Sequence, residues 1–202
     1  MHIWHWRTWE ELPYLTCSLL EPWPHGFFTQ HFWPRSPLEL TQVLQQEAEV
    51  FQVKQVHGNT VLTSSQVGRP LSRAVIEEQS PPPADGLISE QAEQAVWVAS
   101  ADCTPVLIAD SETGQVAAVH AGWRGTALKI VPQAVAGLRK QGSKSQNLRI
   151  AMGPAIAGAV YQVSNQVAAQ SPHMSAKSAY EGLPPEPLPL AVRRVLQEGL
   201  PP

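Results

Sequence analysis

The sequence predicts an α/β or α+β domain with a mixed β-sheet. The chain has 202 residues, a length at which one domain is usual. Its hydrophobic content of 43% is enough for a sizeable core. Short strand-like segments are interleaved with two or three helical segments, which is the arrangement that packs helices on a sheet.

The N-terminal third of the chain is rich in aromatic residues, and its pattern predicts short strands. Successive side chains over residues 2–6 alternate between two sets, which is typical of a strand with two different faces. Residues 25–29 are predicted to form a second short strand. Further along, Ser36 and Glu39 match a capping box with proline at the first helical position. This pattern predicts a helix over residues 37–48.

The middle of the chain predicts a series of short strands. Two of them, at residues 51–56 and 60–63, flank a turn at residues 57–59. A polar loop follows over residues 64–83 and ends in three prolines. Four more strands are expected at residues 86–89, 95–100, 106–109 and 116–120. A turn at residues 111–114 should join the last two of these as a hairpin.

The C-terminal half begins with a helical pattern over residues 126–141. Pro132 lies inside this pattern and should kink the helix, and Gly142 should end it. A last strand is expected at residues 148–152.

The composition changes after residue 170, where prolines break any long element. We therefore expect a domain over residues 1–170 and a Pro-rich irregular tail over residues 171–202. One amphipathic helix is expected within the tail, at Ala191–Gln197.

Charge and hydropathy exclude some classes of partner. The net charge is -3 and there is no basic block, which argues against nucleic acid as the main partner. No apolar run approaches the roughly 18–20 residues that span a bilayer. The N-terminus lacks the apolar stretch of a secretory signal, so we expect a cytoplasmic protein.

The two cysteines have different settings in the sequence. Two cysteines do not make a disulfide framework. Cys17 lies on an apolar run and is expected to be an inert core thiol. Cys103 follows an aspartate and precedes a loop, which makes it a candidate site residue.

Two imidazoles complete the candidate site. His57 lies in a Val-His-Gly turn, and His120 begins a His-Ala-Gly-Trp-Arg-Gly segment. Each is placed where a predicted strand meets a loop, as site residues usually are. Together with Cys103 they suffice to hold a catalytic zinc with a fourth position open for water or substrate. A Cys nucleophile with a His base is the alternative, and both interpretations predict an enzyme.

Four neighbouring residues are ambiguous. Asp102 can orient a ligating imidazole, whereas Asp85 is expected to be a turn residue. Arg124 lies between two glycines at the expected start of a helix, where it can hold the turn or bind an anion. We count Arg124 and Asp102 as candidate substrate-binding residues. Trp123 is expected to pack.

Five segments occur in an order typical of one family. They are KQVHGNTV (54–61), ADGLIS (84–89), ADCTPVLIAD (101–110), AAVHAGWRGT (117–126) and GPAIAGAVYQV (153–163). With these motifs the chain resembles the laccase-domain family, which is also called the polyphenol-oxidase-like or peptidoglycan-editing-factor family.

The resemblance implies both a fold and an activity. The implied fold is a layered α/β sandwich with mixed β-sheets, related to a bacterial cysteine-hydrolase toxin domain. The implied metal is zinc, bound by His57, Cys103 and His120, which would also be the catalytic residues. The implied reactions are phosphorolysis of adenosine, inosine and S-methyl-5′-thioadenosine, and deamination of adenosine. Purine nucleosides and phosphate would therefore be the partners.

Three other functions stay open at this point. The family has been linked to copper-dependent phenol oxidation, but no motif here supplies further copper ligands, so zinc is favoured over copper. A cysteine amidase that edits peptidoglycan precursors would use Cys103 as nucleophile and His120 as base. The third alternative is a protein that binds a partner without catalysis.

The chain departs from the family pattern in two places. Gln30 stands where family members usually carry an arginine, and the chain ends at Pro202 before the family's Phe-Ser-Tyr-Arg-Arg segment. The resemblance therefore implies a C-terminally truncated chain. We expect such a chain to keep the metal site and to phosphorolyse adenosine weakly or not at all.

Overall fold

The computed structural model describes residues 2–72, 80–158, 160–161 and 163. Its centre is a five-stranded sheet with the strand order β10-β8-β9-β6-β5. Neighbouring strands are antiparallel except β5 and β6, which are parallel. The strands are β5 (Val61–Thr63), β6 (Gly86–Ile88), β8 (Thr104–Asp110), β9 (Val116–Ala121) and β10 (Leu148–Met152). The predicted mixed α/β architecture is confirmed.

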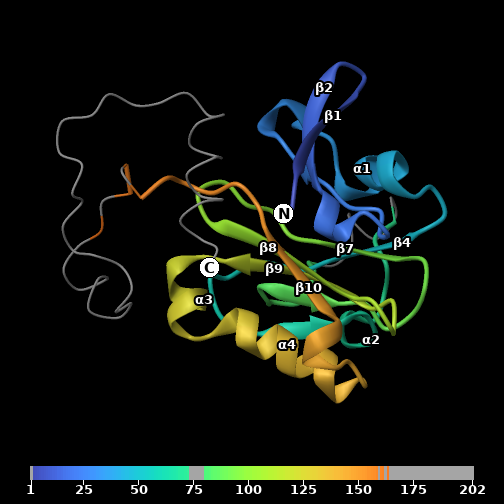
Figure 1. The fold of residues 1–202 in the computed structure, drawn as a ribbon, viewed down its shortest axis with the longest axis vertical. Coiled ribbons are helices and arrows are strands. Elements are labelled where there is room, and N and C mark those ends of the chain that lie inside the picture. Colours follow the sequence, from blue (N-terminus) through green and yellow to red (C-terminus); the bar gives the residue numbers. More distant parts are fainter. Residues whose placement is uncertain (1, 73–79, 159, 162, 164–202) are drawn as a thin grey trace.

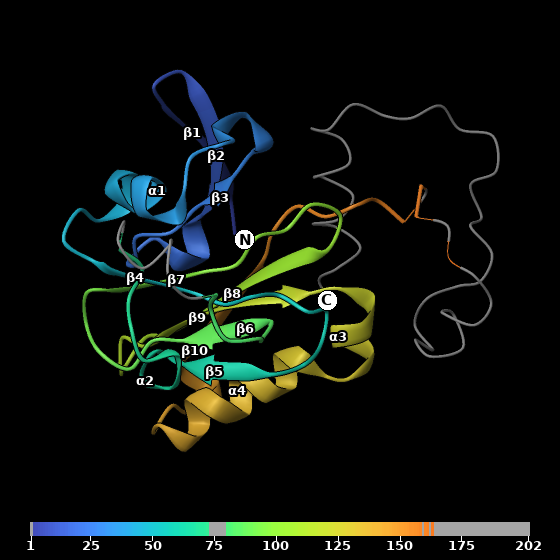
Figure 2. The same cartoon turned by 180° about the vertical axis from the view of Figure 1, so that it is seen from behind.

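Helix α4 (Ile130–Lys140) covers one face of the central sheet, and two smaller sheets lie on the other side (Figure 1; Figure 2). One is antiparallel, β1-β2-β3, and the other is the parallel pair β4-β7. Their strands are β1 (Trp4–Trp9), β2 (Leu12–Cys17), β3 (Phe27–Phe28), β4 (Glu49–Gln52) and β7 (Gln94–Trp97). Further helices are α1 (Pro37–Leu44), α2 (Ser64–Val67), α3 (Trp123–Ala127) and 3-10 turns at Ser18–Leu20, Gln30–Phe32 and Ser145–Asn147.

The two-residue period of the strands decides which side chains reach each layer. On β9, Val119 packs in a buried cluster with Leu138 of α4. Val116 lies on the opposite face, where it packs against a cluster that contains Cys17. His120 follows the same alternation, so its ring lies on the face away from α4.

The helix predicted over residues 126–141 is two helices in the structure. The chain turns between α3 and α4 at Lys129, whose φ of 61° lies in the left-handed region. The expected kink at Pro132 is therefore wrong. This proline lies in the first turn of α4, where a missing N–H costs no helical hydrogen bond. Gly142 follows the end of α4 with a φ of 103°, as predicted.

The strands predicted at residues 51–56 and 60–63 are present with shifted bounds as β4 and β5, which pair with β7 and β6. One expectation for the middle of the chain is wrong. The polar loop predicted over residues 64–83 begins with the short helix α2. Thr63 and Gln66 cap this helix reciprocally, in a second capping box.

Other predicted elements are present with shifted bounds. The capping box starts α1 as expected, but the helix ends at Leu44 rather than at residue 48. Strand β1 runs over Trp4–Trp9 instead of residues 2–6, and β3 is shorter than the strand predicted over residues 25–29. The hairpin of β8 with β9 and the strand β10 are confirmed.

The predictions for the end of the chain cannot be compared with this architecture. The tail over residues 171–202 and the helix expected at Ala191–Gln197 lie outside the described residues. Within the part of the chain that the structure describes, no helix combines the length and the apolar composition needed to cross a bilayer.

Candidate metal centre

Three side chains from distant parts of the sequence meet at one end of the central sheet. One ligand atom each of His57, Cys103 and His120 lies within 4.8 Å of the others. Tetrahedral ligands at about 2.0–2.3 Å from zinc stand roughly 3.5 Å apart, so small side-chain rotations close this set around a metal. Among the described residues, this is the one group of His, Cys, Asp and Glu with such a geometry.

The pairing of β8 with β9 brings the thiol beside one imidazole. Pro105 is the register partner of His120. Cys103 precedes β8 and Gly122 follows β9, so the same register places these two residues next to each other. Because Cys103 is two residues from Pro105, the partner of His120, the pairing of this one hairpin also brings residue 103 close to residue 120.

His57 reaches the same point from the loop between β4 and β5. Its φ of 58° lies in the left-handed region, which is uncommon for a residue with a side chain. The rings of His57 and His120 meet edge to face at 87°, with centroids 4.9 Å apart. His57 is exposed, Cys103 is half-buried and His120 is buried. The centre is therefore open to solvent on the His57 side.

The carboxylate of Asp85 connects two of the three side chains. It is completely buried and lies 2.9 Å from Nδ1 of His120. It also accepts hydrogen bonds from the backbone N–H groups of Val56, His57 and Gly58, at 3.2, 3.0 and 2.7 Å. Burial by itself would raise the pKa of this carboxyl, but the bonds from His120 and the loop lower the pKa overall. The sequence-based interpretation of Asp85 as a turn residue is wrong.

Asp85 rather than Asp102 orients the ring of His120. An ionised carboxylate only accepts hydrogen bonds, so Nδ1 carries the proton, and Nε2 is the nitrogen that offers a lone pair in the neutral ring. Asp102 is exposed, and its main-chain carbonyl accepts the N–H of Ile156 at 3.0 Å. One signal in the sequence could have identified Asp85: it directly precedes Gly86–Ile88, a strand that is buried at every position.

Glycines leave room for a metal between the donors. A Cβ on Gly122 would lie 3.0 Å from Sγ of Cys103, and 3.6 and 3.7 Å from ring carbons of His57 and His120. A Cβ on Gly125 would lie 2.8 Å from the carbonyl oxygen of Gly58. The second glycine therefore lets α3 approach the loop that carries His57. The donor set and the space that Gly122 leaves both fit a metal with an open position.

The two cysteines differ in their surroundings. Cys17 is 3% exposed, and burial raises the pKa of its thiol, as expected for an inert core residue. Burial also raises the pKa of Cys103, and the nearby carboxylates of Asp102 and Asp85 raise it further. A thiolate at Cys103 near neutral pH therefore requires a cation beside it.

Arg124 lies two residues after Gly122, and Tyr161 belongs to the segment after β10. Arg124 is exposed on α3, with its guanidinium carbon 4.9 Å from the ring centre of Trp123. Tyr161 was not singled out in the sequence. Burial raises the pKa of its hydroxyl, and the charges of Cys103 and Asp102 raise it further.

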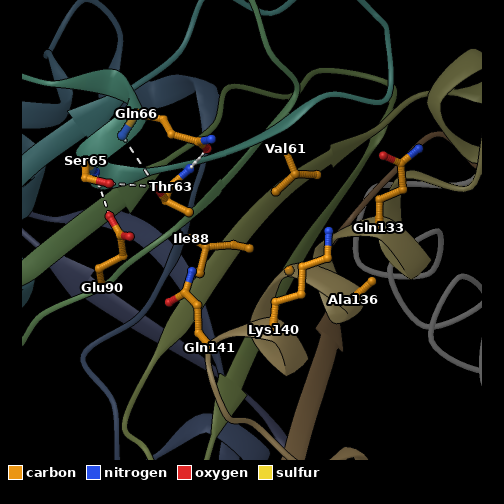
Figure 3. A pocket seen from close by; sticks show the side chains of 11 residues that line it. Val61, Thr63, Ser65, Gln66, Ile88, Glu90, Gln133, Ala136, Lys140 and Gln141 are labelled. Atoms are coloured by element: carbon orange, nitrogen blue, oxygen red, sulfur yellow. Dashed lines mark hydrogen bonds between the residues drawn. The ribbon is translucent and has the colours of Figure 1, made fainter.

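A separate hollow of about 580 Å³ lies between α4 and the edge strand β5 (Figure 3). Val61 and Ile88 line its apolar part, and Lys140 of α4 extends along it. At one side, Glu90 accepts the backbone N–H of Ser65 at 2.7 Å. None of the three candidate ligands lines this hollow, so it is distinct from the metal centre.

Comparison with known proteins gives a consistent picture. Residues 36–197 match the family model described as multi-copper polyphenol oxidoreductase laccase. A purine nucleoside phosphorylase of Synechocystis sp. is 51% identical over 167 residues, which are 82% of this chain and 62% of that protein. An adenosine deaminase from an unknown prokaryotic organism is 36% identical over 83 residues, which are 41% of this chain and 32% of that protein. The chain thus spans less than two thirds of either relative.

A solved structure shares the fold. The hypothetical protein YfiH of Bacillus licheniformis superposes with a TM-score of 0.59 and 24% sequence identity. The match covers 80% of this chain and 64% of that one. It supports the mixed α/β architecture and its several sheets.

Proposed function

The chain belongs to the family described as multi-copper polyphenol oxidoreductase laccase, and we propose that it is a zinc-dependent purine nucleoside phosphorylase that also deaminates adenosine. The observation that carries the proposal is the group of His57, Cys103 and His120 around the space beside Gly122. The Synechocystis relative is named for the first activity and the prokaryotic deaminase for the second. The substrates would be adenosine, inosine and S-methyl-5′-thioadenosine, with phosphate as the co-substrate.

Zinc suits the ligands better than copper does. Two imidazoles and a thiolate are nitrogen and sulfur ligands that zinc takes, and three of them with one open position suffice for a catalytic zinc. A blue-copper site adds a weak axial ligand, and multicopper chemistry needs further clusters of histidines. Among the described residues, His57, Cys103 and His120 form the one group that could hold a metal ion, so no further copper ligands are gathered there. We therefore propose zinc, although the family description names copper.

The residues of the chain prepare the centre for its chemistry. A bound zinc would supply a Lewis acid that polarises water or a substrate oxygen. Asp85 holds the Nδ1 proton of His120, and the exposed side at His57 admits the nucleoside. Arg124 offers a fixed fork of donors to phosphate. Asp102 offers a carboxylate to the hydroxyl or amino groups of the nucleoside.

The proposal is tested by metal content and product release. Zinc is measured by elemental analysis, and bases released from adenosine and inosine are quantified with and without phosphate. We expect bound zinc, weak base release that occurs only with phosphate, and conversion of adenosine to inosine without it. The variant His120→Ala should lose zinc and both activities. Zinc-loaded protein that releases no base with phosphate would contradict the phosphorylase.

A cysteine hydrolase is a second candidate, because Cys103 and His120 are adjacent. The variant Cys103→His separates the two functions, since it keeps a metal ligand but removes the nucleophile. A zinc enzyme should retain metal and part of its activity in this variant. A cysteine hydrolase should lose all turnover and should work in the presence of a chelator.

A further inference from the structure

We propose that Asp85 is the positioning residue of the metal centre, a single carboxylate that fixes both histidine ligands and thereby sets the metal affinity. The proposal depends on the proposed function only in that His57, Cys103 and His120 bind a metal. Asp85 is not itself counted among the ligands, because its two oxygens are directed at the His120 ring and at the loop around His57.

The first contact of Asp85 fixes the ring of His120. Oδ1 lies 2.9 Å from Nδ1, and the backbone of the same two residues is joined by a 2.7 Å bond from the His120 N–H to the Asp85 carbonyl. Both side chains are buried, at 0% and 4% exposure. A ring held in this way has one tautomer and one orientation, with Nε2 as the nitrogen that faces the metal.

The second contact fixes the loop that carries His57. Three consecutive backbone N–H groups, of Val56, His57 and Gly58, converge on the same carboxylate. They hold His57 in its left-handed backbone conformation, with its exposed ring against His120. One buried charge therefore positions two ligands that are 63 residues apart in the sequence.

The variant Asp85→Asn breaks this arrangement with almost no change in size. Oδ1 serves the N–H of His57 and Nδ1 of His120, whereas Oδ2 serves Val56 and Gly58. An amide replaces one oxygen with an NH₂ group, which cannot accept. In either orientation of the amide, two donors lose their acceptor. When the NH₂ group replaces Oδ2, the N–H groups of Val56 and Gly58 lose their acceptor and the loop is held less firmly. When it replaces Oδ1, Nδ1 of His120 loses its acceptor, as does the N–H of His57, and the tautomer of His120 is no longer fixed.

The experiment compares zinc dissociation constants, measured by competition with a chromogenic chelator and without substrate. We expect Asp85→Asn to weaken zinc binding about 10–100-fold, as loss of an outer partner of a ligating histidine does. The matched control is Asp110→Asn. Asp110 is equally buried and accepts the N–H groups of Glu112 and Thr113, but at the opposite end of β8. This control should bind zinc within about twofold of the wild type.

A second measurement does not depend on the folding of any variant. In the zinc-loaded wild type, NMR of the imidazole nitrogens should show His120 with a protonated Nδ1 and a metal-bound Nε2. The opposite tautomer would overturn the proposal, as would Asp85→Asn binding zinc as tightly as the wild type. Absence of zinc binding by the wild type would overturn it together with the proposed function. Tight zinc binding without nucleoside turnover would overturn only the proposed function.

Discussion

Two regions of the molecule pair a cysteine with a histidine, and they use the pair differently. Beside the N-terminal sheet, His25 donates Nδ1–H to the carbonyl of Trp23 and accepts the backbone N–H of Cys17 at Nε2, both at 2.8 Å. At the end of the central sheet, His120 gives Nδ1–H to Asp85 and keeps Nε2 for a ligand. The first ring has no lone pair to offer, whereas the second has one.

This difference shows what makes a candidate site. The residue types are the same in both regions, but His25 contacts the backbone N–H of Cys17 rather than its thiol. The decisive features are a free lone pair and a neighbouring glycine, Gly122, that leaves space for an ion. The pair near the N-terminus is structural because each polar atom already has a protein partner.

The largest difference between the two regions is expected in zinc affinity, when the histidine of each region is replaced. His120→Ala should weaken zinc binding by more than about 100-fold, beyond the loss of an outer-shell partner, because one of three ligands is gone. His25→Gln should bind zinc within about twofold of the wild type, since this residue lies outside the donor group. Chelator competition measures both. Equal losses in the two variants would mean that the regions do not differ.

A methyl group at Gly122 tests the space beside the donors. Gly122→Ala places a Cβ 3.0 Å from Sγ of Cys103, so we expect at least a roughly tenfold loss of zinc affinity. Gly114→Ala is the control, because its φ of 75° strains alanine, unlike the φ of -70° at Gly122, but nothing lies within 4 Å of the added Cβ. It should cost about 1–2 kcal/mol of stability without affecting zinc. Unchanged zinc binding by Gly122→Ala would exclude a metal beside this residue.

The rates at which the two thiols are alkylated should also differ between the two regions. Chelator treatment should expose Cys103 to iodoacetamide, whereas Cys17 should stay unlabelled in both states because it is buried. Burial and two carboxylates raise the pKa of Cys103, so labelling of the metal-free protein should accelerate as the pH rises beyond neutrality. Mass spectrometry of labelled peptides measures both rates. Equal labelling of the two thiols without a chelator effect would argue against the centre.

The smallest expected effect is on the pH dependence of stability. Burial lowers the pKa of His25 more than the hydrogen bond to the Trp23 carbonyl raises it. The unfolded chain then binds the proton more readily, so this stability is complete above about pH 6.5 and is lost as the pH falls below it. With a chelator present, the Tm should fall more steeply between pH 7 and pH 5 in the wild type than in His25→Gln. Parallel curves would show that His25 is protonated equally in both states.

Local signals predicted a large part of the fold. The capping box at α1, the turn between β8 and β9 and the strand β10 depend on residues close in the sequence, and each is present. The helix over residues 126–141 was wrong because the break at Lys129 has no local marker. The chain turns there where α3 packs against the loop at Gly58.

The candidate ligands were visible in the sequence, but their organiser was not. His57, Cys103 and His120 each stand beside a glycine or a loop, which is a local pattern. The role of Asp85 depends on contacts 27 to 35 residues away, with the loop on one side and with β9 on the other. The sequence by itself determined where helices start, which strand faces are apolar and which side chains can bind a metal, because these follow from neighbouring residues. Only the tertiary structure decided which strands pair and which buried carboxylate meets which imidazole, because burial makes each polar atom depend on the partner that packing brings to it.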